Sequence, residues 1–138
     1  MAKPEPCLRL ARPEDVESIH RLFCLPEVYQ YLADGQAPPV QIAHDWVEAS
    51  PLDHDRFAGG LWLLHDPSTL QLMGLSRLHA EDTRALELTF LLDPIFWGQG
   101  WATRMAHTII MYAFHSGFVS LVWAADYNAT GCTTAVAL

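Results

Sequence analysis

The residues with the clearest chemical potential form a glycine-flanked loop directly before a helical segment. Gly98 and Gly100 flank Gln99, and residues 101–116 have the apolar spacing of an amphipathic helix. A helix N-terminus carries unpaired N–H groups and the positive end of the helix dipole, so it stabilises an anion. Glycines allow positive φ and let backbone amides approach a phosphate without side chains in the way. The loop therefore predicts a phosphate or pyrophosphate site.

Spacing separates this loop from two other phosphate-binding motifs. No Gly-Lys-Ser/Thr follows it, which excludes the nucleotide P-loop, and the third glycine of the dinucleotide fingerprint is missing. A plain tight turn explains a single Gly-x-Gly equally well, because glycine is common in turns. The surrounding sequence must therefore decide between a turn and a ligand site.

That surrounding sequence resembles a known family. Residues 87–94 read Glu-Leu-Thr-Phe-Leu-Leu-Asp-Pro, and residues 97–103 read Trp-Gly-Gln-Gly-Trp-Ala-Thr. Together they resemble the Gcn5-related N-acetyltransferases (GNAT), and most of all their ribosomal-protein N-terminal acetyltransferase (RimJ/RimL-type) branch. The superfamily pattern Gln/Arg-x-x-Gly-x-Gly/Ala is matched at Gly100 and Ala102, with tryptophan in its first position. The resemblance extends over residues 8–128.

The resemblance implies an acetyl-CoA site and the residues that form it. Main-chain amides of the loop would hold the diphosphate, and the strand before the loop would pair with the pantetheine arm. An asparagine after the next strand would bond to that arm. The residues at these positions are Phe90, Leu91, Leu92, Trp97, Gly98, Gln99, Gly100, Trp101, Ala102, Thr103 and Asn128. No metal is implied, and the second substrate would be a primary amine of a peptide N-terminus or a small molecule.

One acid lies within the strand that leads to the loop. Alternation over residues 84–92 places Glu87 with Thr89 and Leu91, opposite the other leucines. Glu87 can belong to a solvated strand face, or it can be a general base that takes a proton from the amine through a water. In the family reaction Asp93 or a water chain could do the same work. A strand amide near Leu92 could stabilise the oxyanion.

Three helices are expected around the sheet. Apolar positions on one face predict a helix over 13–23 that packs on the sheet, followed by a loop or broken helix over 25–36. After the break at Pro38-Pro39, clustered apolar residues predict a second helix over 40–49 that stops at Ser50-Pro51. A polar loop is expected to follow this stop and to carry Asp53, His54 and Asp55.

The expected strands form a hairpin and a crossover. Residues 57–65 and 70–79 read as the hairpin, with a turn at 66–69 and a bulge near Gly74. Strand 84–92, helix 101–116 and strand 118–124 read as a βαβ-like crossover. A short strand at 8–10 precedes them.

The fold class expected from the resemblance is α/β (α+β), the GNAT acyltransferase fold. It has a mixed, mostly antiparallel sheet, flanked by helices, with parallel central strands that splay apart. We expect a single domain over 1–138, in which 1–84 form the substrate side and 85–130 the acetyl-CoA core. Residues 25–36 would carry substrate specificity.

After residue 130 the resemblance fails, because family members continue through a further helix and two strands that residues 131–138 do not match. An open edge at 119–124 would then invite a homodimer or some local cover. The missing part also supplies the tyrosine or serine proposed to reprotonate the thiolate. The expected function is therefore an N-acetyltransferase, with a catalytically impaired acyl-CoA-binding or regulatory remnant as the alternative. A structural domain without a ligand is a third, weaker possibility.

Composition indicates the number of domains and the expected compartment. A chain of 138 residues with 51% hydrophobic content and five tryptophans indicates one well-filled domain. There is no signal-peptide core and no long apolar run, and the three cysteines are odd in number and far apart. We therefore expect free thiols and a cytoplasmic protein.

Charge and histidine spacing exclude two further classes. A net charge of −8 disfavours nucleic acid as a partner and would suit a cationic amine. The seven histidines show no metal-ligand spacing, so we expect no metal and read them as surface or packing residues.

Overall fold

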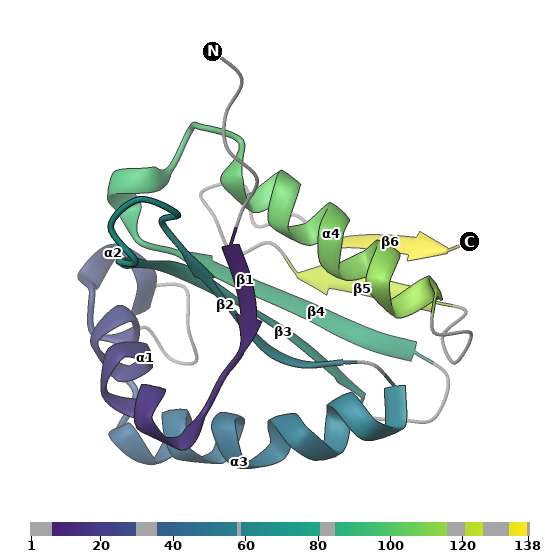
Figure 1. The fold of residues 1–138 in the computed structure, drawn as a ribbon, viewed down its shortest axis with the longest axis horizontal. Helices are drawn as coiled ribbons and strands as arrows, with labels where there is room; N and C mark the ends of the chain where they lie inside the picture. Colours follow the sequence, from purple (N-terminus) through teal and green to yellow (C-terminus); the bar gives the residue numbers. More distant parts are fainter. Residues whose placement is uncertain are drawn as a thin grey trace.

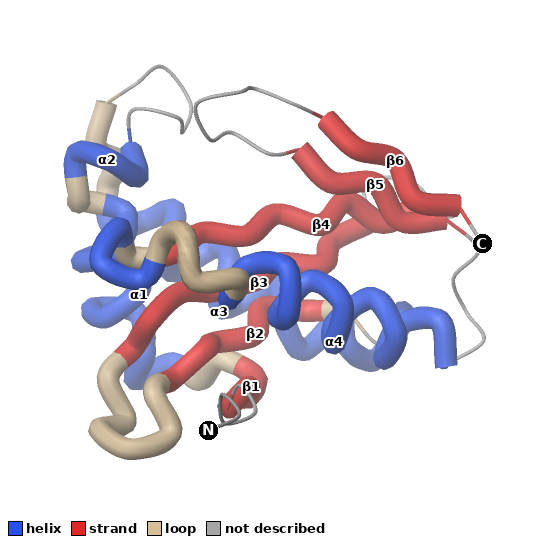
Figure 2. The backbone as a smooth tube through the Cα atoms, turned by 90° about the horizontal axis from the view of Figure 1, so that it is seen from above, coloured by secondary structure: helices blue, strands red, loops and turns tan. Residues whose placement is uncertain are grey.

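The computed structural model describes residues 7–29, 36–57, 59–80, 85–115, 121–125 and 133–137. Its six strands form one sheet in the order β1-β2-β3-β4-β5-β6, which can be followed across Figure 2. All neighbours are antiparallel except β4 and β5, which are parallel. The strands are β1 (Cys7–Leu10), β2 (Gly60–His65), β3 (Leu72–Ala80), β4 (Ala85–Leu92), β5 (Leu121–Ala125) and β6 (Thr133–Ala137). This mixed sheet confirms the expected fold class.

Helices cover both faces of the sheet. Figure 1 shows α1 and α3 on one side and α4 on the other. The helices are α1 (Val16–Phe23), α2 (Pro26–Tyr29), α3 (Val40–Phe57) and α4 (Trp101–His115), with 3₁₀ turns η1 (Pro13–Asp15) and η2 (Pro94–Phe96). α2 occupies part of the stretch expected to carry substrate specificity, and 30–35 lie outside the described residues.

Strand alternation divides the core into two clusters. Leu63, Leu75 and Leu91 face α1 and α3, whose apolar residues complete the first cluster. Leu64 and Leu88 face α4 and form the second cluster with Met105 and Ile109 of that helix, among others. Successive side chains of a strand point to opposite faces, so β2, β3 and β4 are covered on both sides. The helix predicted over 13–23 is confirmed, because its apolar positions are all buried in the first cluster.

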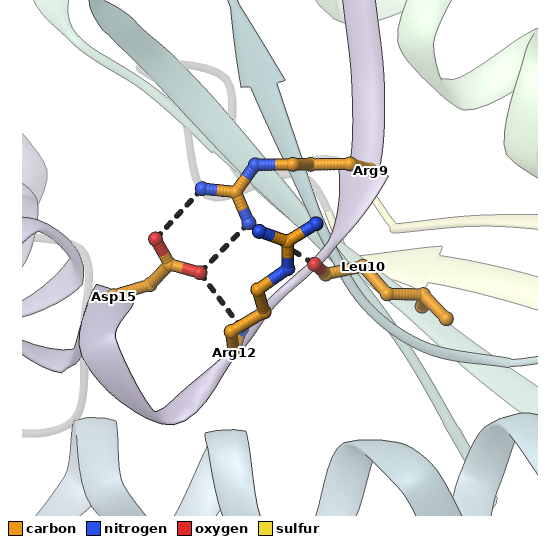
Figure 3. A network of polar contacts seen from close by, with 4 residues as sticks. All are labelled: Arg9, Leu10, Arg12 and Asp15. Atoms are coloured by element: carbon orange, nitrogen blue, oxygen red, sulfur yellow. Dashed lines mark hydrogen bonds and ion pairs between the residues drawn. The ribbon is translucent and has the colours of Figure 1, made fainter.

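A polar network fixes the chain where β1 turns into η1 (Figure 3). Arg9 donates two hydrogen bonds to Asp15, at 2.8 and 2.7 Å, and the amide of Arg12 donates a third at 2.7 Å. The bonds from Arg9, with help from the Arg12 amide, lower the pKa of Asp15 below its ordinary value although burial opposes them. Burial, aided by the charge of Arg9, lowers the pKa of His65 nearby. The network anchors α1 to the first strand.

The second helix does not stop where the sequence predicted. α3 continues through Pro51 to Phe57, so the expected polar loop is wrong and Asp53 lies inside the helix. Proline removes one helical hydrogen bond, a cost of about 3 kcal/mol. Contacts with the sheet offset this cost: Ser50 Oγ accepts from the Leu61 amide at 2.8 Å, and Asp53 bonds to His79 at 2.9 Å.

The predicted hairpin is confirmed, with β2 and β3 joined by a turn at 66–69. The register shifts by one residue beside Gly74, because Leu64 pairs with Gly74 while His65 pairs with Leu72. A Cβ at position 74 would collide with the Leu91 carbonyl oxygen. Glycine at 74 therefore permits the close approach of β3 to β4 next to the bulge.

The last described strand covers the edge of β5. β6 pairs antiparallel with β5, from Leu121 opposite Ala137 to Ala125 opposite Thr133. The edge of β5 is therefore paired within the chain. Of the two outcomes expected for that edge, local cover is the one found.

Candidate functional site

The loop between β4 and α4 is built by short local hydrogen bonds. Asp93 caps η2, because its Oδ1 accepts from the Ile95 amide at 3.1 Å. The amide of Trp97 donates to the Pro94 carbonyl at 3.1 Å and closes this turn. Gly98 (φ +75°) and Gly100 (φ +82°) then adopt left-handed conformations that other residues rarely take. These two glycines turn the exposed loop into the N-terminus of α4.

The amides of this loop divide into those already used and those available. Trp97 donates within η2, and Arg104 donates to the Gly100 carbonyl at 3.1 Å as the first bond of α4. Within the described ranges, the amides of Gly98, Gly100, Ala102 and Thr103 donate to no other backbone group. A Cβ built on either glycine meets no atom within 4 Å, so the space beside the loop is open. Of the amides predicted to hold the phosphate, that of Trp97 is therefore already bonded within the chain.

Side chains of the loop fold back and leave its backbone accessible. Gln99 Nε2 donates to the Ile95 carbonyl at 3.2 Å, and Gln99 Oε1 accepts from Trp101 Nε1 at 3.4 Å. Trp101 is buried, and the Arg104 guanidinium lies 4.9 Å from its ring centroid. Arg104 brings a positive charge to the first turn of α4, which the sequence reading did not single out.

β4 extends beyond the described part of β5 on the side of this loop. Their parallel register runs from Ala85 opposite Leu121 to Leu88 opposite Ala124, and among the described residues it ends there. β3 stays paired with β4 as far as Leu92. The last four residues of β4 therefore lie beyond the described β5 register, and the residues that follow β5 lie outside the described part.

The register shows which backbone N–H and C=O groups of β4 point toward β5. The Asp93 amide donates to Met73 of β3 at 2.8 Å, so the alternation of an antiparallel pair turns the backbone groups of Phe90 and Leu92 toward β5. The Leu92 carbonyl accepts from Trp97 Nε1 at 2.9 Å. Leu91, with the opposite parity, is buried against α1 and α3. Of the predicted strand residues, Phe90 and Leu92 are thus the two whose backbone groups face the β5 side of β4.

Two predicted site residues lie at the edge of what the structure describes. The backbone of Glu87 lies in β4, opposite His79 on β3 and Trp123 on β5, but its side chain lies outside the described part. Asn128 also lies outside the described residues. Asp93, the alternative base, uses its carboxylate in the η2 cap.

A buried acid and a histidine form a pair that the sequence reading missed. Nδ1 of His79 on β3 lies 2.9 Å from Oδ2 of Asp53 on α3, and their side chains are 28% and 10% exposed. The two residues are 26 positions apart in the chain, so no local spacing could have revealed the pair. Within the described residues, no three His, Cys, Asp or Glu gather as a metal site.

Comparison with known families decides the identity of this fold. Residues 7–131 match the family model described as "Acetyltransferase (GNAT) domain". The chain belongs to the GNAT family. No match was found among curated protein sequences. None of the described helices of this GNAT chain is both long and apolar enough to cross a membrane.

Solved structures share the GNAT fold at low sequence identity. A RimL ribosomal L7/L12 alpha-N-protein acetyltransferase in complex with coenzyme A is 18% identical, with a TM-score of 0.71 over 88% of this chain and 71% of that one. An acetyltransferase from Salmonella typhimurium that modifies the N-terminal serine of L7/L12 is 19% identical, with the same TM-score and coverage. Spermidine N-acetyltransferase from Vibrio cholerae, with CoA and spermine, is 18% identical, with a TM-score of 0.67 over 87% and 70%. These similarities support the fold of the GNAT chain.

Proposed function

We propose that this GNAT chain transfers the acetyl group of acetyl-CoA to a primary amine by direct attack within a ternary complex. The observation that carries the proposal is the loop before α4, where Gly98 and Gly100 are held at positive φ and present amides without a backbone acceptor among the described residues. Such amides at a helix N-terminus favour a diphosphate.

The proposed path of the cofactor follows the splayed strands. The diphosphate lies against the amides of 98–103, and the pantetheine arm runs along the β5-facing edge of β4 at Phe90 and Leu92. Asn128 bonds to the same arm. This arrangement brings the thioester to the part of β4 between Leu88, where the described register with β5 ends, and Leu92.

The proposed chemistry needs positioning, one base and one hydrogen-bond donor. The amine nitrogen attacks the thioester carbonyl carbon, the carbon–sulfur bond breaks, and the thiolate leaves with a proton. The Leu92 amide stabilises the oxyanion, and Glu87 takes the ammonium proton through a water. Holding both substrates in line supplies much of the rate.

The proposed acceptor is a peptide N-terminus or a small cationic amine. A net charge of −8 attracts cations. The structural neighbours carry names that refer to both kinds of acceptor, a ribosomal-protein N-terminus and spermidine. We place the acceptor on the side formed by residues 1–84, and the cofactor core in 85–130.

Compartment and assembly are part of the same proposal. Cys7 and Cys24 are exposed and unpaired with each other, as suits a reducing cytoplasm. A homodimer formed by strand pairing would use an outer strand of the described sheet, β1 or β6, since β5 is paired on both sides. Light scattering with and without CoA tests the dimer.

Two measurements test the proposed function. CoA should raise the Tm of the protein, and thiol release from acetyl-CoA should depend on an amine from a panel of peptides and polyamines. Glu87→Gln should lower kcat by roughly 10²-fold and leave CoA-induced stabilisation intact. Glu48→Gln, an exposed residue of α3, serves as the matched control and should behave as wild type. Stabilisation by CoA without any turnover would point instead to an acyl-CoA-binding protein, and no stabilisation at all would refute the cofactor site.

A further inference from the structure

The Asp53–His79 pair has the build of a carboxylate–imidazole base. A carboxylate only accepts hydrogen bonds, so the 2.9 Å contact requires that Nδ1 of His79 is the donor. The neutral imidazole then keeps its lone pair on Nε2. Asp53 is 7% exposed as a residue and is held in the last turns of α3, so the ring has a fixed partner. The ring itself keeps contact with solvent, because the His79 side chain is 28% exposed.

The register of the sheet places His79 opposite the backbone of Glu87, the proposed base. His79 on β3 is directly opposite Glu87 on β4. Residues directly opposite in an antiparallel pair share one face of the sheet, with Cβ atoms roughly 5 Å apart. The same face carries Arg77, whose guanidinium lies 4.7 Å from the Trp46 ring of α3. His79 therefore belongs to the α3-covered face, next to the strand that the cofactor is proposed to follow.

We infer that the Asp53–His79 pair is the proton acceptor that works beside Glu87 in the acetyl transfer, an inference that rests on the proposed function. The ammonium N–H bond breaks, and its proton passes through water or Glu87 to Nε2 of His79. Asp53 stabilises the resulting imidazolium and takes no proton itself. The imidazolium then releases the proton to solvent, which balances the conversion of ammonium and thioester to amide and thiol. His79 is a relay residue and Asp53 its positioning residue.

Asp53 of α3 is the charged group in contact with this imidazole. Arg77 lies on the same face of β3 with its guanidinium over the Trp46 ring, and Arg56 is exposed one turn after Asp53. The backbone of Glu87 on β4 is directly opposite His79, and β2 begins with glycine at this level.

The test compares His79→Gln with His44→Gln, the same substitution at an exposed position of α3. His79→Gln should lower kcat about 10²-fold, remove or displace the acid limb of the kcat/KM profile, and leave CoA-induced stabilisation close to wild type, while Tm falls because the buried Asp53 loses its partner. His44→Gln should change none of these. Asp53→Asn should lower kcat less and move the acid limb to lower pH, since a neutral amide stabilises an imidazolium less than a carboxylate does.

The outcomes separate this inference from the proposed function. A His79→Gln protein with wild-type kcat and pH profile, alongside an active wild type, would overturn the inference and leave the proposed function standing. If Asp53→Asn is less stable but keeps the wild-type kcat and pH profile, the pair is purely structural. This result would also overturn the inference and leave the proposed function standing. If Asp53→Asn does not fold, the His79→Gln profile decides. Wild type without turnover on any amine would overturn both.

Discussion

Replacing the two glycines of the loop by alanine tests the cradle without disturbing the core. Gly98 and Gly100 have φ of +75° and +82°, and a Cβ at either position meets no atom within 4 Å. The cost of Gly100→Ala is therefore conformational, roughly 1–2 kcal/mol for a residue with Cβ in the left-handed region. In the free protein the exposed loop can relax and avoid much of that cost. Binding a diphosphate requires the original conformation, so the cost returns on binding.

A penalty of about 1–2 kcal/mol on binding corresponds to a rise in the Kd for CoA of roughly 5- to 30-fold. Titration calorimetry with CoA measures it, and a thermal scan of the free protein should show little change. Gly59→Ala is the matched control, because its Cβ would lie 2.5 Å from the Leu78 carbonyl oxygen, away from the loop. The Gly59→Ala variant should have a lower Tm, and its folded fraction should bind CoA with the wild-type Kd. A Gly98→Ala/Gly100→Ala protein with the wild-type Kd would refute the cradle.

Two further predictions concern single side chains. Asp15→Asn should destabilise the protein by about 2 kcal/mol at pH 7, because it removes the charge that Arg9 and the Arg12 amide bond to. The pKa of Asp15 lies below the ordinary 3.8, so the stabilisation by its carboxylate is complete above pH 3.8 and is lost as the pH falls through the folded pKa. The urea midpoints of the variant and the wild type should therefore converge at that low pH. A constant difference between the midpoints down to pH 2 would contradict this. Trp97→Phe removes the indole donor to Leu92 but leaves a half-exposed ring, so KM for acetyl-CoA should rise about threefold while Tm changes little. An unchanged KM would show that the Trp97 indole does not support this edge of β4.

Much of the fold could be predicted because its signals are local. The 3.6-residue spacing of Val16, Ile19, Leu22 and Phe23 fixes which face of α1 is buried, since only that face can remove these side chains from water. The alternation of residues around Leu88 likewise determines which side chains of β4 point to each face of the sheet. The site loop could be predicted for a similar reason, because left-handed backbone needs glycine and a helix start needs an anion or a cap.

The errors arose where distant contacts outweigh a local preference. Pro51 signals a helix end, yet α3 continues because Ser50 and Asp53 bond to the sheet. β6 could not be placed from its own residues, since a strand needs a partner edge and that edge is β5.

The amino-acid sequence alone determined the family likeness, the glycine loop and the helix that follows it, because backbone conformation and amphipathic spacing are properties of neighbouring residues. Only the tertiary structure brought Asp53 to His79 and Trp97 Nε1 to the Leu92 carbonyl. It also decided which amides of the loop remain available. Hydrogen bonds between side chains on separate elements depend on how the sheet and helices pack, and no pattern along the chain encodes that distance.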